Sequence, residues 1–459
     1  MGKPETQEEK YKTMTEKPVS SLICRLAVPT IISMLVTSFY NMADTFFVAR
    51  IGTSATAAVG VSFALMAIIQ AFGFFCGHGS GNYISRKMGQ HRFDEAQQMA
   101  ATGFFTALAL GTVIFLLGEI LIDPLCRILG ATETILPYAR QYLRLILIGA
   151  PYMTASLVLN NQLRFQGSAF YAMIGITSGA VLNIILDPLF IFTFGMGVAG
   201  AALATSLSQV VSFFLLLNGT RLGGNIRIHW RDYTPTLANF REILRGGVPS
   251  LARQSLNSLA TVCLNLASGG YGDAAIAAMS IVTRVMMMTV SAIIGFGQGF
   301  QPICGFNYGA GLYERVRRAF WFCVRLCFCV LVLVSAAAIA LAPQIISLFL
   351  AADPQVQEIG TLALRLQCAL IPLFAFTCLS NMMLQTMGIA GRATVLAMAR
   401  QGLFFIPAVW VLEHAFGLLG VQLAQPVADV LSFLLAIPLT LPVLRRLRES
   451  EAAKKVSKT

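Results

Sequence analysis

Long apolar segments recur along the whole chain and limit the folds that it can adopt. A helix that crosses the hydrocarbon core of a bilayer needs about 20 mainly apolar residues, and twelve segments of this chain meet that requirement. Only 12% of the residues are charged, whereas soluble domains average about 25%. We therefore predict an all-α membrane protein with twelve transmembrane helices, and we exclude a soluble enzyme. The helices are predicted near residues 26–50, 55–84, 96–122, 138–165, 169–194, 197–218, 245–270, 274–304, 318–342, 358–387, 393–415 and 417–443.

The distribution of basic residues predicts how these helices are oriented. The formal net charge is +12, which is compatible with a nucleic-acid partner. However, Lys and Arg gather in the tails and in every second connection, as the positive-inside rule requires. We therefore expect that the protein is surrounded by membrane lipid and has no nucleic-acid partner. We also expect both termini to lie in the cytoplasm. Examples of these basic residues are Arg86, Lys87, Arg92, Arg221, Arg227, Arg231, Arg445, Arg446 and Arg448.

An internal repeat divides the predicted helices into two sets of six. Residues 28–89 match residues 248–309 at an offset of 220. Because six crossings return the chain to its starting side, both halves have the same orientation, and we expect two pseudo-symmetric six-helix bundles with a cavity between them. The matched pairs include Val28 with Val248, Pro29 with Pro249, Gly77 with Gly297, Gly79 with Gly299, and Gly89 with Gly309.

The repeat also sets the predicted domain boundaries. We expect a cytoplasmic N-terminal tail at 1–25, a first bundle at 26–220 and a second bundle at 245–443. The cytoplasmic linker at 221–244 is polar, basic and long enough for an amphipathic surface helix. A basic cytoplasmic tail is predicted at 444–459.

Polar residues inside three apolar segments of the first half predict an ion site. Asp44 lies in the first segment, and Asp187 lies in the fifth, four residues after Asn183 and therefore on the same helix face. A charged side chain in hydrocarbon costs at least about 3 kcal/mol, so such residues usually face a cavity or a partner. From the helical rise of about 1.5 Å per residue, Asp44, Asp187 and Thr205 of the sixth segment should reach one level in the outer half of the membrane.

These four residues would form an oxygen-rich site. Two carboxyl groups, an amide and a hydroxyl suit a hard cation such as Na⁺, or a proton shared by the two acids. The alternative is that Asp44 and Asp187 are separate, neutral, hydrogen-bonded core acids. Pro29 removes one helical hydrogen bond from the first segment and favours a kink there. A helix that can kink and that carries an acid indicates an ion site in a protein that moves.

A second group of residues is a candidate lining for a substrate cavity. Methionine adapts to varied apolar ligands, although packing or contact with lipid explains the methionines of this group equally well. The two adjacent asparagines also fit the interfacial end of a helix. The group comprises Asn41, Asn160, Asn161, Arg253, Asn257, Met286 and Met287.

Arg253, Arg284 and Asp429 are the charged residues inside the second half that we single out. We expect an Arg–Asp pair that stiffens the second bundle, with a second ion site as the alternative.

With these residues in place, the chain resembles the multidrug and toxic compound extrusion family, in particular its MepA-like bacterial branch. The resemblance covers nearly the whole chain, and it is the combination of segments that is specific. The residues that carry it are Pro29, the segment Asn-Met-Ala-Asp at 41–44 with Ala-Arg-Ile-Gly at 49–52, Asn-Ile-Ile-Leu-Asp-Pro at 183–188, the small-residue segment at 197–205, and the Gly-rich segment at 297–310.

This resemblance implies an antiporter that works by alternating access. It would export small amphiphilic, often cationic, organic molecules while Na⁺ or H⁺ enters, with no other cofactor and no catalytic residue. It implies a monomer in a bacterial plasma membrane, and a cation site in the first bundle to which Asp44, Asn183, Asp187 and Thr205 correspond. Some members rely instead on acids in the seventh and tenth helices. Here the seventh predicted helix contains no acid, which favours the first bundle.

Two other functions remain open from the sequence. A lipid-linked oligosaccharide flippase would share the two-bundle plan, and it would be favoured if Arg253 and Arg284 clustered toward the central cavity to bind a pyrophosphate. A membrane scaffold or receptor would keep the buried acids for structure alone.

Overall fold

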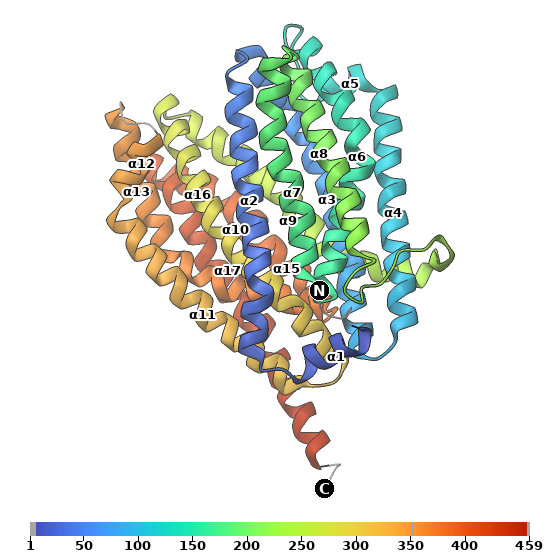
Figure 1. Ribbon diagram of the computed structural model, residues 1–459. Coiled ribbons are helices and arrows are strands. Elements are labelled where there is room, and N and C mark those ends of the chain that lie inside the picture. Colours follow the sequence, from blue (N-terminus) through green and yellow to red (C-terminus); the bar gives the residue numbers. More distant parts are fainter. Residues whose placement is uncertain (1–5, 350–352, 457–459) are drawn as a thin grey trace.

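The computed structural model describes residues 6–349 and 353–456, and these residues form a helical protein (Figure 1). They contain no β-strand, which confirms the predicted all-α class. The elements are α1 (Gln7–Glu16), α2 (Val19–Ala49), α3 (Thr53–Gly89), α4 (Phe93–Ile120), α5 (Ile122–Ile128), α6 (Leu136–Phe165), α7 (Ala169–Pro188), η1 (Leu189–Thr193), α8 (Gly197–Gly219), η2 (Trp230–Asp232), α9 (Leu237–Gly269), α10 (Asp273–Gly309), α11 (Tyr313–Ala340), α12 (Ala342–Phe349), α13 (Pro354–Leu370), η3 (Ile371–Leu373), α14 (Phe374–Thr386), α15 (Ala390–Met398), η4 (Ala399–Phe405), α16 (Ile406–Phe416) and α17 (Leu418–Val456).

Eleven helical segments of the described chain are long and apolar enough to cross a bilayer, one fewer than the twelve predicted. The exception is the predicted seventh crossing. There α9 is a helix of 33 residues that carries Arg253, Gln254 and Asn257 near its middle. The side chains of Gln254 and Asn257 line a cavity, which is where polar side chains of a membrane helix are expected. The helix is therefore present where it was predicted, and it is not among the eleven because its polar and charged residues lower its mean hydropathy.

The helices form two bundles that meet along α2, α3, α9 and α10. α2 packs against α10, and α3 packs against α9. Glycines permit the closest approaches. A Cβ atom on Gly79 would lie 2.4 Å from the carbonyl oxygen of Ile243, and one on Gly299 would lie 2.7 Å from backbone atoms of Ala27. These contacts lie toward the end of the molecule that carries α1 and the last turns of α17 (Figure 1), so the bundles are closed at that end.

Arg86 fastens the two bundles at this closed end. Its guanidinium donates a hydrogen bond to the carbonyl oxygen of Thr386 at the end of α14 (2.8 Å) and pairs with the Glu242 carboxylate of α9 (3.2 Å). A Cβ atom on Gly309 would lie 2.1 Å from the carbonyl oxygen of Arg86. One residue of α3 therefore contacts three segments of the second bundle.

The N-terminal region predicted as a tail at 1–25 is helical from residue 7 and lies across both bundles. Lys10 of α1 donates to the hydroxyl of Ser168 in the first bundle (2.7 Å). On the other side, Asn307 of α10 donates to the carbonyl oxygen of Met14 (3.0 Å). α2 begins at Val19, earlier than predicted. Residues 1–5 lie outside the described part of the chain.

The linker does not form the surface helix that its length permitted. Between α8 and α9 the chain contains one short helical turn, η2. Gly223 and Gly224 have φ angles of 60° and 64°, which interrupt a helix and which glycine adopts without strain. The Trp230 ring instead packs edge-on against Phe105 of α4, with ring centroids 4.7 Å apart. α9 then begins at Leu237, inside the predicted linker range.

At the other terminus, α17 continues as a helix to Val456 instead of ending in a tail. Residues 457–459 lie outside the described part of the chain.

Candidate functional site

Three helices of the first bundle bring the predicted ion-site residues together. α2 supplies Asp44, α7 supplies Asn183 and Asp187, and α8 supplies Thr205. All four side chains are buried, with at most 4% of any residue exposed. The helical rise predicted that these residues lie at one depth in the membrane. In the structure they also lie close to one another, because Asn183 contacts Asp187 and Thr205, and Asp44 lies near Asp187.

The end of α7 is shaped by its sequence. Pro188 has no backbone N–H and cannot continue the hydrogen-bond pattern of the helix, and the π-helix η1 follows it directly. Gly200 lets α8 approach this irregular segment, since a Cβ atom there would lie 2.8 Å from the backbone of Phe190. Asp187 is thereby held at a point where the helix changes its geometry.

The Asn183 amide connects Asp187 to Thr205. In the orientation that satisfies its neighbours, the amide nitrogen donates to Oδ2 of Asp187 over 3.0 Å. The amide oxygen accepts from the hydroxyl and from the backbone N–H of Thr205, both at 3.2 Å. Asn183 therefore fixes the Asp187 carboxyl group relative to α8.

Asp44 and Asp187 face each other across α2 and α7. Their side chains are close enough for a hydrogen bond between the carboxyl groups, so they are not separate core acids. Oδ1 of Asp44 is buried and accepts no hydrogen bond from the described residues. Two carboxylates cannot hydrogen-bond unless one carries a proton, and a buried acceptor without a donor is costly. A proton or a small cation between them would remove both problems, so the residues fit Na⁺ or H⁺.

Two tyrosines that the sequence analysis missed complete this site. The Tyr40 side chain lies near Thr205 and within electrostatic range of both acids. Tyr142 of α6 is fully buried beside the same acids, and its hydroxyl contacts Sδ of Met66 at 3.7 Å. Tyr40 precedes Asp44 by four residues, and that spacing on one helix face was an available signal.

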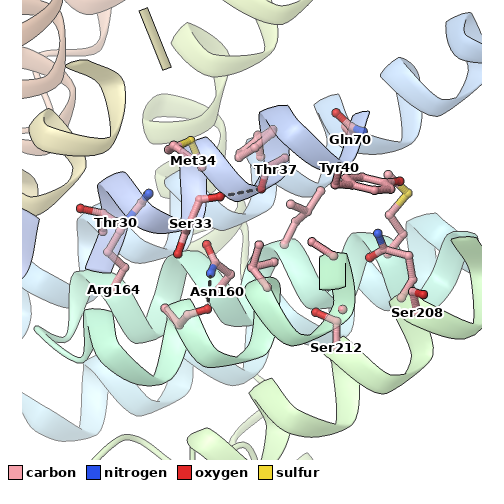
Figure 2. A pocket seen from close by; sticks show the side chains of 18 of the residues that line it. Thr30, Ser33, Met34, Thr37, Tyr40, Gln70, Asn160, Arg164, Ser208 and Ser212 are labelled. Carbon is pink, nitrogen blue, oxygen red and sulfur yellow. Dashed lines mark hydrogen bonds between the residues drawn. The ribbon is translucent and has the colours of Figure 1, made fainter. Parts of the chain in front are cut away.

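A cavity adjoins this site, and Figure 2 shows side chains that line it. Its volume is about 120 Å³, which is enough for several water molecules. α2, α3, α6, α7 and α8 supply most of the wall. Tyr40, which is near the two acids, lies toward one end of the cavity, whereas Thr30 and Arg164 lie at the opposite end (Figure 2). Asn41 and the ion-site residue Asn183 also line this cavity.

The residues proposed as one substrate cavity are divided between two cavities. Asn41 and Asn160 line the cavity of the first bundle. Asn161 is buried next to it and donates to the carbonyl oxygen of Leu157 (2.6 Å). A second cavity lies within the other bundle, and its lining includes Asn257, Met286 and Met287.

Arg253 and Arg284 do not form the cluster that a pyrophosphate site would need. Arg253 donates to Oδ1 of Asn381 over 3.2 Å. Arg284 is exposed, and neither arginine lines the cavity of the first or the second bundle. The feature that would have favoured a flippase is therefore absent from the described residues.

Asp429 does form an Arg–Asp pair, but with a different arginine. Its Oδ1 lies 2.7 Å from Nε of Arg400 and also accepts a hydrogen bond from Gln425 (3.0 Å). The Arg400 guanidinium stacks over the Phe374 ring at 4.4 Å. Arg400 belongs to the π-helix η4, whose altered pitch places it toward α17. Neither Arg253 nor Arg284 pairs with Asp429.

Comparison with known families classifies the chain. The profile of the MatE family matches residues 29–189 and 249–411, which together are most of the chain. The chain belongs to the MatE family. The two matched segments of this MatE protein begin 220 residues apart, which is the offset of its internal repeat.

Individual MatE relatives match along nearly their whole length. The chain is 26% identical over 449 residues to the multidrug export protein MepA of Staphylococcus haemolyticus, and this covers 97% of the chain and 99% of that protein. It is 27% identical over 435 residues to MepA of Staphylococcus aureus, which covers 94% and 95% of the two chains. A structure described as the outward-facing conformation of a multidrug resistance MATE family transporter of the MOP superfamily superposes with a TM-score of 0.89 at 28% identity, over 95% of this chain and 98% of that one. These similarities confirm the predicted family and fold, those of a multi-pass membrane transporter.

Proposed function

We propose that this MatE protein is a secondary active antiporter that exports amphiphilic, often cationic, organic molecules in exchange for Na⁺ or H⁺. The observation that carries the proposal is the buried pair Asp44 and Asp187, which adjoins a cavity large enough to admit part of a ligand. Acids buried at this cost in a membrane protein usually mark ion or proton pathways. The names of the MepA relatives support export of drugs.

We place both termini in the cytoplasm of a bacterial cell, because the basic residues gather at the end of the molecule that carries them. In this orientation the closed end between the bundles faces the cytoplasm. The protein would then be in an outward-facing state, as the similar MATE structure is described to be.

The coupling cation would bind to Asp44 and Asp187, with Asn183, Thr205 and Tyr40 holding the two carboxyl groups in place. A bound cation draws the two acids together, whereas the empty pair repels. Coupling requires that this difference change the relative stability of two states of the transporter.

α2 provides a route from the cation site to the contact between the bundles. This helix continues through Pro29, where it lacks one backbone hydrogen bond. The next residue, Thr30, donates to the carbonyl oxygen of Gly295 in α10 over 2.6 Å. A bend at Pro29 would therefore change both the wall of the cavity and the contact with the second bundle.

The test is transport by Asp44→Asn and Asp187→Asn in proteoliposomes. Each substitution keeps the size of the side chain but removes the charge that binds the cation, so gradient-driven export should fall by at least about tenfold, the factor that corresponds to about 1.4 kcal/mol. The matched control is Asp123→Asn. Asp123 is about half exposed and pairs with Arg140 (2.6 Å), so this variant should keep full transport.

Na⁺ and pH gradients are imposed in separate experiments, which identifies the coupling ion. Full gradient-driven export by both Asn variants would refute the assignment of the cation site.

A further inference from the structure

Arg164 lies at the end of the first-bundle cavity that is opposite to the ion site (Figure 2). It belongs to the last turn of α6, and only 2% of the residue is exposed. It is thus a fully buried guanidinium that lines a cavity, next to Thr30 and Ala169.

The partners of Arg164 are all neutral. One Nη atom donates to Oδ1 of Asn161 (2.5 Å) and lies 3.5 Å from Nε2 of His78. Since Nδ1 of His78 lies 3.1 Å from the carbonyl oxygen of Phe74, this nitrogen carries the proton and Nε2 is free to accept. The Phe165 ring contacts the guanidinium at 5.3 Å. Nε of Arg164 has no hydrogen-bond partner among the described residues.

The surroundings add positive charge instead of neutralising it. No Asp or Glu carboxylate of the described chain lies within 4.0 Å of the Arg164 guanidinium. Arg253 of α9 is close enough to repel both Arg164 and His78. A buried charge without a counter-ion is strongly unfavourable, so the arrangement calls for an anion.

The two ends of the cavity therefore have opposite electrostatic character. Tyr40 and Asn183 line the end next to the two acids, and Thr30 lines the end next to Arg164. Thr30 and Tyr40 are ten residues apart on α2, which corresponds to about 15 Å along the helix. This separation spans an organic molecule of two or three fused or linked rings.

We propose that Arg164 is an anion subsite of the transport cavity, which binds the carboxylate of zwitterionic substrates whose cationic end lies toward Asp44 and Asp187. This inference rests on the proposed export function and names its substrate class. An Nη atom of Arg164 supplies the donor, and Arg253 adds long-range attraction. The hydroxyl of Thr30 already donates to backbone carbonyls. The Arg164 guanidinium is therefore the group at this end of the cavity that distinguishes a carboxylate from a neutral group.

The test compares two probes that differ only in the anionic group: a rhodamine with a free benzoate, and its methyl ester. Their affinities for the purified full-length protein are measured by fluorescence anisotropy. The wild type should bind the carboxylate dye more tightly than the ester. Arg164→Gln should weaken binding of the carboxylate dye by about tenfold or more and that of the ester by less than about twofold, because it removes the charged donor that bonds the carboxylate and leaves the rest of the cavity unchanged. Arg164→Lys should retain part of the preference.

The control is Arg127→Gln, since Arg127 is exposed and pairs with Glu133 (3.0 Å); it should change neither affinity. Equal weakening of both dyes by Arg164→Gln, or an unchanged affinity for the carboxylate dye, overturns the proposal. If Arg164→Gln does not elute as a folded protein, the wild-type measurement alone tests the proposal. Equal affinity of the wild type for both dyes would also overturn the proposal. Export of the ester by proteoliposomes is measured separately, so that failure of the antiport function is distinguished from failure of the subsite.

Discussion

At the residue scale, the candidate cation site combines two acids with neutral groups that hold them. Asn183 connects Asp187 to Thr205 by hydrogen bonds, and Tyr40 of α2 lies near Thr205 and both acids. Such positioning groups do not bind charge strongly themselves, but they fix the carboxyl oxygens before the cation arrives. Their contribution should therefore be smaller than that of either acid.

We expect Tyr40→Phe to weaken binding of the coupling cation by about threefold to tenfold, because it removes one hydroxyl dipole beside the two acids, worth about 1 kcal/mol, and no charge. The measurement is the cation concentration that gives half-maximal export in proteoliposomes. Tyr138→Phe is the control, since Tyr138 lies on α6 with 42% of its surface exposed. If Tyr40→Phe abolished export as completely as Asp44→Asn, Tyr40 would have a larger role than positioning.

At the element scale, each half contains a π-helix near a proline, but the two π-helices differ in position and in chemistry. A π-helix follows Pro188 in the first half, and η4 precedes Pro407 in the second. Asp187 lies at the first, whereas Arg400 lies within the second, neutralised by Asp429. Irregular turns of this kind often occur at functional sites. The irregular segments therefore do not follow the repeat, and the acidic pair of Asp44 and Asp187 lies in the first bundle.

The contact between α2 and α10 depends on glycine at 299. We expect Gly299→Ala to lower the free energy of unfolding by about 1–3 kcal/mol, because the added Cβ would meet the backbone of Ala27 at 2.7 Å and neither helix can yield locally. Gly60→Ala is the matched control. Gly60 lies in α3 with no atom within 4 Å of an added Cβ, and the change should stabilise the helix by about 0.5–1 kcal/mol. Thermal unfolding in detergent measures both; a stable Gly299→Ala protein would contradict the tight contact.

At the scale of the whole molecule, the closed end is held by contacts that must break when the bundles exchange access. Arg86 links α3 to Glu242 and to the end of α14, and α1 contacts both bundles through Lys10 and Met14. Asp44 of the cation site lies near the opposite end of α2, whose first residues lie at the closed end (Figure 1). Opening would therefore cost these contacts without disturbing either bundle.

We expect the closed end to open more often in Arg86→Gln. The substitution removes the ion pair with Glu242, in which the Arg86 side chain is only 15% exposed, and the hydrogen bond to the carbonyl oxygen of Thr386. Hydrogen–deuterium exchange should become several-fold faster at the start of α9 and the end of α14, in proportion to the increased population of the open state. Arg127→Gln, which removes an exposed pair within one bundle, should leave these rates unchanged. Unchanged exchange in Arg86→Gln would show that glycine packing alone closes this end.

Much of the architecture follows from the sequence because the bilayer imposes length and polarity on each helix separately. Apolar length predicted the helices, including α9, whose polar residues Gln254 and Asn257 line a cavity. The helical rise and the spacing of four predicted that Asp44, Asn183, Asp187 and Thr205 lie together. These inferences need only one helix at a time and a common membrane frame.

The tertiary structure decided every relation that joins helices distant in sequence. Tyr142 beside the acids, Arg400 as the partner of Asp429, and Arg164 as a buried cation without an acid could not be inferred from spacing. The division of the lining residues between two cavities could not be inferred from the sequence either. The physical reason is that rotation of each helix about its own axis is set by packing against its neighbours, and that rotation determines which polar side chains meet.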